Sequence, residues 1–302
     1  FNIIFIFMVS SAISQDFPYF DGKNAFKYLQ MQCDFGPRFP GSKGHAKFIK
    51  FMTPFLDSLS GELIVHHATV KHPFNPGNVD LTNYFARFHP EREKRLLFMA
   101  HWDTREIADK DKVLKNQSKP ILGANDGASG VAVLMEIAAI LYNNPLEFIG
   151  VDILLVDGED MGTSGKPESF GLGTKEFAQN YPLPRPEYAV CLDMVGDKDL
   201  EFKIERFSYY QSPQIVDKVW TLAQNLGLSE FKHKLGPPVY DDHRVLYLET
   251  KIPAIDIIDF SYPNEKDNYW HTLQDIPENC SAESLEAVGR LVTAFIYSED
   301  LK

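Results

Sequence analysis

Cysteine is scarce in this sequence, and its spacing excludes two kinds of cross-linked fold. The 302 residues include three cysteines, Cys33, Cys191 and Cys280. An odd number at wide spacing is not a disulfide framework, and no pair forms a CxxC zinc motif. Cys191 lies in an apolar run and is interpreted as a core residue. Whether Cys33 and Cys280 form a single disulfide is left undecided at this point.

The sequence also lacks a block of basic residues. Lys and Arg number 30 against 42 Asp and Glu, and the formal net charge of −12 is spread along the chain. Nucleic acids and anionic membrane surfaces are recognised through clustered positive charge. We therefore expect no nucleic-acid partner and no binding to an anionic membrane surface.

No hydrophobic run reaches the roughly 20 residues that span a bilayer, so we expect no membrane span. The first segment, "FNIIFIFMVSSAISQDF", is an apolar stretch broken by Asn2 that turns small and polar. Ala12-Ile13-Ser14 resembles the cleavage region of a secretory signal peptide. We expect a signal peptide over 1–14, a secreted or periplasmic protein, and a mature chain that begins at Gln15. A buried N-terminal strand is the alternative.

The composition that remains is that of a folded globular protein. Hydrophobic residues make up 44% of the chain and charged residues 24%. The length allows two domains, but single α/β domains often reach this size. The sequence shows no internal repeat, no low-complexity segment and no Gly/Ser linker. We therefore expect one domain over 15–302.

Apolar patterns alternate between the periods of strands and helices. Helical spacing occurs within 23–60, and a Gly/Pro-rich loop interrupts it. Strands are predicted over 61–70, 78–88, 95–101, 148–157, 187–196 and 252–260. Helices are predicted over 125–144, 173–181, 212–227, 241–250 and 281–300. The pattern predicts a single α/β domain with a mixed, largely parallel central sheet flanked by helices.

Polar side chains follow the predicted strands, where the site of an open α/β sheet lies. His101 ends one strand, and Asp193 lies near the end of another. Glu159 and Asp160 follow a third, and Trp270-His271 comes after a fourth. Asn125-Asp126 opens a helix. Imidazole and carboxylate groups suit zinc, and a catalytic zinc site keeps one position open for substrate.

Each of these residues has a plain structural interpretation when taken alone. A single His is more often hydrogen-bonded than metal-bound, and Asp126 could be a helix N-terminal acid. Asp241-Asp242 could be an N-cap pair, and Trp270 could be core. Glu159 and Asp160 could lie on a solvated turn. Their joint occurrence at successive strand ends favours a metal site.

Six motifs occur in order along the chain, and together they resemble a known family. They are "AHWDTRE", "GANDGASGVAVLMEIA", "VDGED", "CLDMVGD", "YDDHRVLYL" and "YWHTLQD". The chain resembles the zinc-dependent M28-type aminopeptidase clan and, more narrowly, its glutaminyl-peptide cyclotransferases, over roughly residues 23–300. "GPRFPGS", "AHWDTR", "DDH" and "WHT" together favour the cyclotransferase branch. The resemblance implies a zinc aminopeptidase-like fold.

The resemblance implies a set of three zinc ligands. Asp126, Asp160 and His271 match these positions, and one zinc ion per chain is expected. The family usually has Glu where this chain has Asp160, so a small backbone shift must compensate the shorter side chain. His101 and Asp193 match positions that hold a second metal ion in the aminopeptidases.

The resemblance also implies catalytic and substrate-binding residues. Glu159 matches the general acid/base. Asp193 and Asp241 match acidic residues that hydrogen-bond around the reacting amide. Trp270 matches the aromatic wall beside the zinc. Tyr262 matches a pocket position of animal cyclases, but a longer loop separates it here from Trp270.

The implied activity is zinc-dependent cyclisation of N-terminal glutamine to pyroglutamate with release of ammonia. The partners would be peptides or proteins with N-terminal Gln, and we expect a monomer. The alternative is an M28-type dinuclear zinc aminopeptidase, in which His101 and Asp193 become ligands of a second zinc. A non-catalytic binding module is disfavoured, because every expected position carries a competent side chain. His101 is otherwise expected to contact substrate.

Overall fold

The structure is a computed structural model that describes residues 17–264 and 266–301. The predicted signal peptide over 1–14 and Gln15 lie outside the described residues, so these predictions and the domain bounds 15–302 stay predictions. Within the described ranges, no helix combines the length and the apolar character that crossing a membrane requires.

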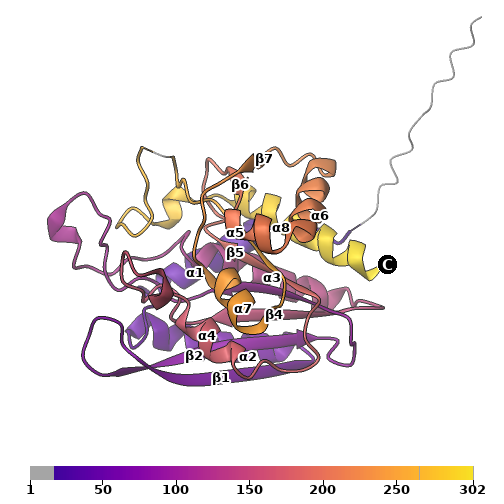
Figure 1. Cartoon of the computed structure of the whole chain (residues 1–302), viewed down its shortest axis with the longest axis horizontal. Coiled ribbons are helices and arrows are strands. Elements are labelled where there is room, and N and C mark those ends of the chain that lie inside the picture. Colours follow the sequence, from indigo (N-terminus) through magenta and orange to yellow (C-terminus); the bar gives the residue numbers. More distant parts are fainter. Residues whose placement is uncertain (1–16, 265, 302) are drawn as a thin grey trace, which may run out of the picture.

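A six-stranded mixed sheet forms the centre of the molecule (Figure 1). Its strand order is β1-β2-β4-β3-β5-β8. The strands are β1 (Glu62–Lys71), β2 (Asn78–Phe88), β3 (Arg95–His101), β4 (Gly150–Val156), β5 (Tyr188–Asp193) and β8 (Ala254–Ile258). The pairs β1–β2 and β2–β4 are antiparallel, and the three remaining pairs are parallel. The predicted mixed, largely parallel sheet is confirmed.

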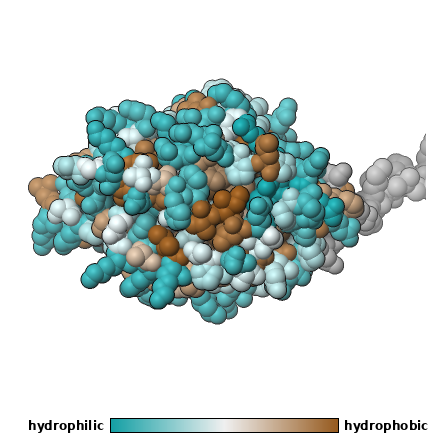
Figure 2. Space-filling view, turned by 90° about the horizontal axis from the view of Figure 1, so that it is seen from below, coloured by the Kyte–Doolittle hydropathy of each residue, from teal (hydrophilic) through white to brown (hydrophobic). Residues whose placement is uncertain are grey.

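Helices cover both faces of this sheet. The helices are α1 (Gly22–Asp34), α2 (Lys43–Leu59), α3 (Ala128–Asn143), α4 (Leu172–Ala178), α5 (Arg206–Gln211), α6 (Pro213–Asn225), α7 (Asp242–Thr250) and α8 (Ala282–Asp300). On one face α1, α3 and α8 pack against one another, and on the other α4 packs against α7. Seen from below, the surface is mainly polar, with hydrophobic residues near its centre (Figure 2).

The two faces of the sheet contribute to separate hydrophobic clusters, because side chains alternate along a strand. In β3, Leu96 and Phe98 belong to the larger cluster, which includes α3 and α8. Leu97 and Met99 belong to the smaller cluster, which includes residues of α4 and α7. Both faces of β3 are therefore buried, which explains its continuous apolar sequence.

The carboxyl ends of β3, β4, β5 and β8 meet at one edge of the sheet, because these strands are mutually parallel. His101 and Asp193 are the last residues of β3 and β5. Glu159 and Asp160 follow β4. The predicted convergence of the polar clusters on one edge is confirmed.

Some local predictions differ from the structure. Helix α3 begins at Ala128 with Gly127 as its N-cap, so Asp126 lies before the helix rather than in it. Ser212 caps α6 by position, but its side chain makes no capping bond. A two-stranded parallel sheet of β6 (Phe202–Ile204) and β7 (Phe231–Leu235) was not predicted, and neither was α5. All three cysteines are buried free thiols.

Candidate metal centre and active site

Three of the predicted ligands form a compact buried group. His271 Nε2 lies 2.8 Å from Asp160 Oδ1 and 3.5 Å from Asp126 Oδ2. Asp126 follows the 104–122 loop, Asp160 follows β4, and His271 lies in the loop between β8 and α8. Segments that are far apart in sequence therefore bring these three side chains to one point, as the sequence predicts.

A second group shares Asp126 with the first. His101 Nε2 lies 3.0 Å from Asp126 Oδ1 and 3.2 Å from Asp193 Oδ1. Asp126 thus directs one oxygen to each imidazole. These are the residues that the resemblance associates with a second metal ion. His101 is buried and is not among the residues that line the cavity described below, so its predicted contact with substrate stays a prediction.

The first group fits a zinc ion on chemical grounds. Among the described residues, the Oδ2 atoms of Asp126 and Asp160 are buried without a hydrogen-bond partner. Burial and the neighbouring Asp160 raise the pKa of Asp126 to about 6, although His101 opposes them. Two carboxylates and an imidazole that approach one another in a buried place make the set of ligands that catalytic zinc takes. A bound cation would compensate the charges that otherwise repel.

Two side chains from the loop after β3 fix the turn that carries Glu159 and Asp160. The Asp103 carboxylate accepts the backbone N–H groups of Glu159 and Asp160, both at 3.1 Å. Arg105 Nη1 donates to the backbone carbonyls of Asp160 and Gly162 at 2.8 and 3.0 Å. Both the N–H groups and the carbonyl groups of this turn are therefore hydrogen-bonded, which fixes the directions of the Glu159 and Asp160 side chains.

His271 is oriented by its backbone and by a second carboxylate. Its φ of 56° is in the left-handed region, which is uncommon for a residue other than glycine. Its Nδ1 lies 3.4 Å from Asp109 Oδ1, and Arg105 Nε donates to the same carboxylate at 2.7 Å. Burial opposes ionisation of Asp109, but His271 and Arg105 outweigh it and hold its pKa below the usual value. A carboxylate behind a ligand imidazole fixes the imidazole's tautomer.

Asp126 is positioned by a buried carboxyl group of the same loop as His271. Asp275 accepts the backbone N–H groups of Asn125 and Asp126 at 2.7 and 3.2 Å. The Tyr262 hydroxyl donates to Asp275 at 3.2 Å, and Tyr262 is fully buried. Tyr262 is not among the residues that line the cavity described below, and its hydroxyl supports Asp275, so its predicted contact with substrate stays a prediction.

A cavity of about 290 Å³ opens beside the first group. Among the predicted catalytic residues, Glu159, Asp193 and Asp241 all line it. Trp270 forms a wall, as predicted, and its ring stacks on His271 with centroids 3.7 Å apart. The cavity therefore combines the candidate metal ligands, three acids and one aromatic wall.

The electrostatics of the cavity distinguish Glu159 from Asp160. Burial raises the pKa of Glu159 well above its usual value, and the nearby Asp241 raises it further. Burial has the same effect on Asp160, but His271 and Arg105 outweigh it and lower its pKa. Adjacent carboxyl groups with opposite pKa shifts are typical of an acid/base paired with a ligand.

Sequence reasoning missed part of the cavity wall. Phe260 lies 4.9 Å from the Trp270 ring, and a Pro-rich segment before α7 forms the facing side. The lining residues that were not predicted are Ser164, Gly165, Pro167, Phe170, Pro237, Pro238, Val239, Tyr240 and Phe260. Phe260 could have been found, because it follows the apolar run of β8 as the other site residues follow their strands.

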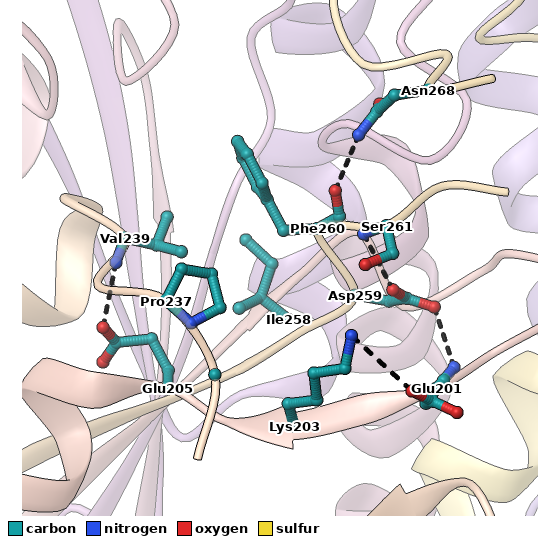
Figure 3. A pocket seen from close by; sticks show the side chains of 11 residues that line it. Glu201, Lys203, Glu205, Pro237, Val239, Ile258, Asp259, Phe260, Ser261 and Asn268 are labelled. Carbon is teal, nitrogen blue, oxygen red and sulfur yellow. Dashed lines mark hydrogen bonds and ion pairs between the residues drawn. The ribbon is translucent and has the colours of Figure 1, made fainter. Parts of the chain in front are cut away.

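A second cavity of about 290 Å³ lies next to the first and shares Pro237, Val239 and Phe260 with it. Figure 3 shows its polar floor, where Lys203 points toward Glu201 and Asp259 accepts the backbone N–H groups of Glu201 and Ser261.

Known proteins resemble this chain in sequence and structure. The model of Peptidase family M28 matches residues 83–296. The crystal structure of Bacteroides thetaiotaomicron glutaminyl cyclase is 34% identical, covers 93% of this chain and 99% of its own, and superimposes with a TM-score of 0.89. A leucine aminopeptidase precursor from the same species is 34% identical, with coverage of 93% and 98% and a TM-score of 0.88.

A more distant relative carries the same activity name as the first of these structures. Glutaminyl-peptide cyclotransferase from Bothrops jararaca is 22% identical over an alignment of 292 positions, which covers 86% of this chain and 76% of the relative. The family match spans most of the described domain, and the structural likeness spans nearly all of it. The chain therefore belongs to peptidase family M28, in the group whose solved members include bacterial glutaminyl cyclases.

Proposed function

We propose that this chain converts the N-terminal glutamine of peptides and proteins to pyroglutamate and releases ammonia. The observation that carries the proposal is the pair Glu159 and Asp160. Both line the cavity, and Asp160 lies 2.8 Å from His271 Nε2, while Glu159 is a buried acid beside it. The relatives that are named glutaminyl cyclases support it.

Asp126, Asp160 and His271 would hold one zinc ion. When bound, zinc supplies Lewis acidity to an amide oxygen at the open coordination position. This role is consistent with the buried, unpartnered oxygens of the two aspartates. Asp109 and Asp275 would keep His271 and Asp126 in the orientation that binding requires.

Glu159 is assigned the proton transfers. It would take a proton from the α-amine of the substrate as the amine nitrogen attacks the γ-carbonyl carbon. It would then give that proton to the side-chain nitrogen, so that the carbon–nitrogen bond of the amide breaks and ammonia leaves. The raised pKa of Glu159 supports its return of the proton.

Asp193 and Asp241 are assigned the orientation of the amine and the leaving nitrogen, because both line the cavity. The rings of Trp270 and Phe260, whose centroids are 4.9 Å apart, would together form a wall against which the side chain of the glutamine folds. The attack is intramolecular, so holding this folded conformation supplies much of the rate enhancement. A small cavity selects the first residue and leaves the rest of the peptide outside.

The second candidate function is that of a dinuclear zinc aminopeptidase. The group of His101, Asp126 and Asp193 favours it, since its donor atoms also lie close enough together to hold a metal ion. The resemblance to a leucine aminopeptidase precursor points the same way. Metal stoichiometry separates the two, because one zinc per chain fits a cyclase and two fit the peptidase.

The test offers the purified protein a glutamine-first peptide and a leucine-first peptide together, with mass spectrometry as the readout. We expect the glutamine peptide to lose one ammonia and the leucine peptide to stay intact. Glu159→Gln and zinc-depleted protein serve as controls for spontaneous cyclisation. Release of free leucine would replace the cyclase proposal with the aminopeptidase.

Export and the monomeric state are parts of the proposal that rest on the sequence alone. Cleavage after Ser14 would expose Gln15, a residue that the enzyme could cyclise. We expect protein isolated from its native host to carry a pyroglutamate there. An unmodified Gln15 in N-terminal mass spectrometry would contradict this, and light scattering would test the monomer.

A further inference from the structure

Behind Asp241, away from the candidate metal ligands, lies a line of buried polar side chains that the proposed chemistry does not use. Asp256 comes from β8, His243 from α7, and Glu205 precedes α5. All three are at most 2% exposed. Some interaction must compensate the burial of these three polar side chains, because burying charged groups is costly.

The contacts order these side chains from the cavity inward. The donor atoms of Asp241, Asp256 and Cys191 all lie within 4.8 Å of one another. Asp256 Oδ2 lies 3.6 Å from His243 Nδ1, and His243 Nε2 lies 3.1 Å from Glu205 Oε2. The order is therefore Asp241, Asp256, His243, Glu205.

Glu205 is the fixed end of this line. Its carboxylate accepts the backbone N–H groups of Phe207 and Ser208 at 2.8 and 2.6 Å. It also accepts the N–H of Val239 at 2.9 Å, which Figure 3 shows. With so many donors, Glu205 is ionised and holds His243 through Nε2.

The other end is short of hydrogen bonds. Among the described residues, Asp241 Oδ2, both oxygens of Asp256 and His243 Nδ1 are buried without a hydrogen-bond partner. Two ionised carboxylates at this separation would repel in a medium of low dielectric constant. Burial raises the pKa of Asp256 well above its usual value, and Asp241 raises it further. A single proton shared by the two carboxyl groups removes the repulsion.

We propose that Asp256 and His243 are positioning residues for Asp241. The Asp241–Asp256 pair holds one proton between its two carboxyl groups, and His243, fixed by Glu205, holds Asp256 in place. Asp241 then presents its carboxyl group to the cavity in one orientation. This inference rests on the proposed function, in which Asp241 orients the reacting nitrogen atoms.

A cation bound by Cys191, Asp241 and Asp256 is the competing explanation for the same unpartnered oxygens. Burial raises the pKa of the Cys191 thiol well above its usual value, and Asp241 and Asp256 raise it further. A cation at this place would need the thiolate of Cys191 as a ligand, because the thiolate is the form that binds metals. Cys191 therefore supplies a matched control, since the shared proton does not need it.

The test compares steady-state kinetics of the zinc-loaded wild-type enzyme with three variants on a glutamine-first peptide. Asp256→Asn keeps the shape but cannot share the proton, and we expect kcat to fall about 10-fold or more with KM within about threefold. His243→Gln should lower kcat in the same direction. Cys191→Ala should keep kcat within about twofold. Zinc content and melting temperature are measured for each variant.

A kcat of Asp256→Asn within about twofold of the wild type would overturn the inference. So would a parallel loss of activity and of one bound metal ion in Cys191→Ala, which would establish the cation site. His243→Gln decides the question if Asp256→Asn does not fold. A wild-type enzyme that leaves glutamine peptides unchanged but releases leucine refutes the proposed function instead. The same ratios are then measured on the leucine peptide, because Asp241 lines the cavity in either case.

Discussion

At the scale of single residues, substitutions that change the charge or the length of the Asp160 side chain test the metal site directly. Asp160→Asn removes the charge that faces His271 at 2.8 Å, and we expect the affinity for zinc to fall at least 10-fold. Asp160→Glu restores the residue that the family usually carries and should keep bound zinc. Elemental analysis after gel filtration measures both. Full zinc occupancy in Asp160→Asn would remove Asp160 from the ligand set.

Asp109 is the residue whose role the sequence leaves most open. Its carboxylate faces His271 Nδ1 at 3.4 Å while Arg105 holds it from the other side. We expect Asp109→Ala to weaken zinc binding by about 10- to 100-fold, because His271 loses the partner that fixes its orientation. A competition titration with a chelator measures this.

The matched control for Asp109 is an acidic residue whose carboxylate forms an ion pair with an exposed lysine. Asp267 pairs with Lys112 at 2.6 Å, and both side chains are exposed. Asp267→Ala should leave zinc affinity unchanged. Equal affinities in the two variants would show that His271 does not depend on Asp109.

The residues that sequence reasoning found and missed differ in one physical respect. Asp126 precedes the buried helix α3, and Glu159 and Asp160 follow the buried strand β4. Asp193 ends the buried strand β5. The apolar stretches of these elements show where each one begins or ends. Asp109 lies in the 104–122 loop, which has no periodicity, so the sequence could not place it.

At the scale of elements, the N-terminus of α5 shows how one carboxylate joins separate segments. Glu205 caps α5 and also binds His243 of α7. Burial opposes its ionisation, but His243 and the helix N–H groups outweigh it and lower its pKa from 4.5 to about 2. The stabilisation is therefore complete above pH 4.5 and is lost as the pH falls toward 2.

We expect Glu205→Gln to lower the free energy of unfolding at pH 7 by about 2–3 kcal/mol, since each pKa unit corresponds to about 1.4 kcal/mol. The difference from the wild type should shrink as the pH falls below about 4.5, where the wild-type carboxylate gains a proton. Denaturant unfolding at several pH values measures this. Glu201→Gln, in a half-exposed pair with Lys203, should cost less than about 1 kcal/mol. A Glu205→Gln difference that does not change with pH would refute the explanation.

The elements that could be predicted are those that bury whole faces. Strands β2 and β3 match their predicted bounds. In β3 the apolar run shows these bounds, because a strand that is buried on both faces is apolar until polar residues begin. The strands β6 and β7 have three and five residues, and most of β7 is exposed, so neither carries a readable period. The helix α5, with six residues, is likewise too short to show a helical period in the sequence.

At the scale of the whole molecule, negative charge is concentrated where the parallel strands end. Asp126, Glu159, Asp160, Asp193 and Asp241 are all nearly or fully buried at this edge. Hydrophobic burial around the sheet must therefore stabilise a site whose own charges repel one another. A bound zinc ion reverses part of this repulsion, so zinc and the global stability are thermodynamically linked.

Zinc removal should consequently lower the melting temperature of the whole domain. At a free zinc concentration of about 100 times Kd, binding adds about 2.7 kcal/mol to the stability. For a domain of this size that corresponds to a shift of roughly 5–10 °C. Calorimetry on chelated and on zinc-loaded protein measures the shift, and magnesium should not replace zinc, because it prefers all-oxygen octahedral sites.

His271→Ala provides the control for this shift. The variant lacks one ligand of the group, so added zinc should leave its melting temperature nearly unchanged, whatever the loss of the buried His271 ring costs the apoprotein. The comparison isolates the contribution of this one site, because the variant retains His101 and Asp193 of the second group. Equal zinc shifts in the variant and the wild type would mean that the stabilising ion binds at the second group, and the one-zinc cyclase site would then have to be moved to His101.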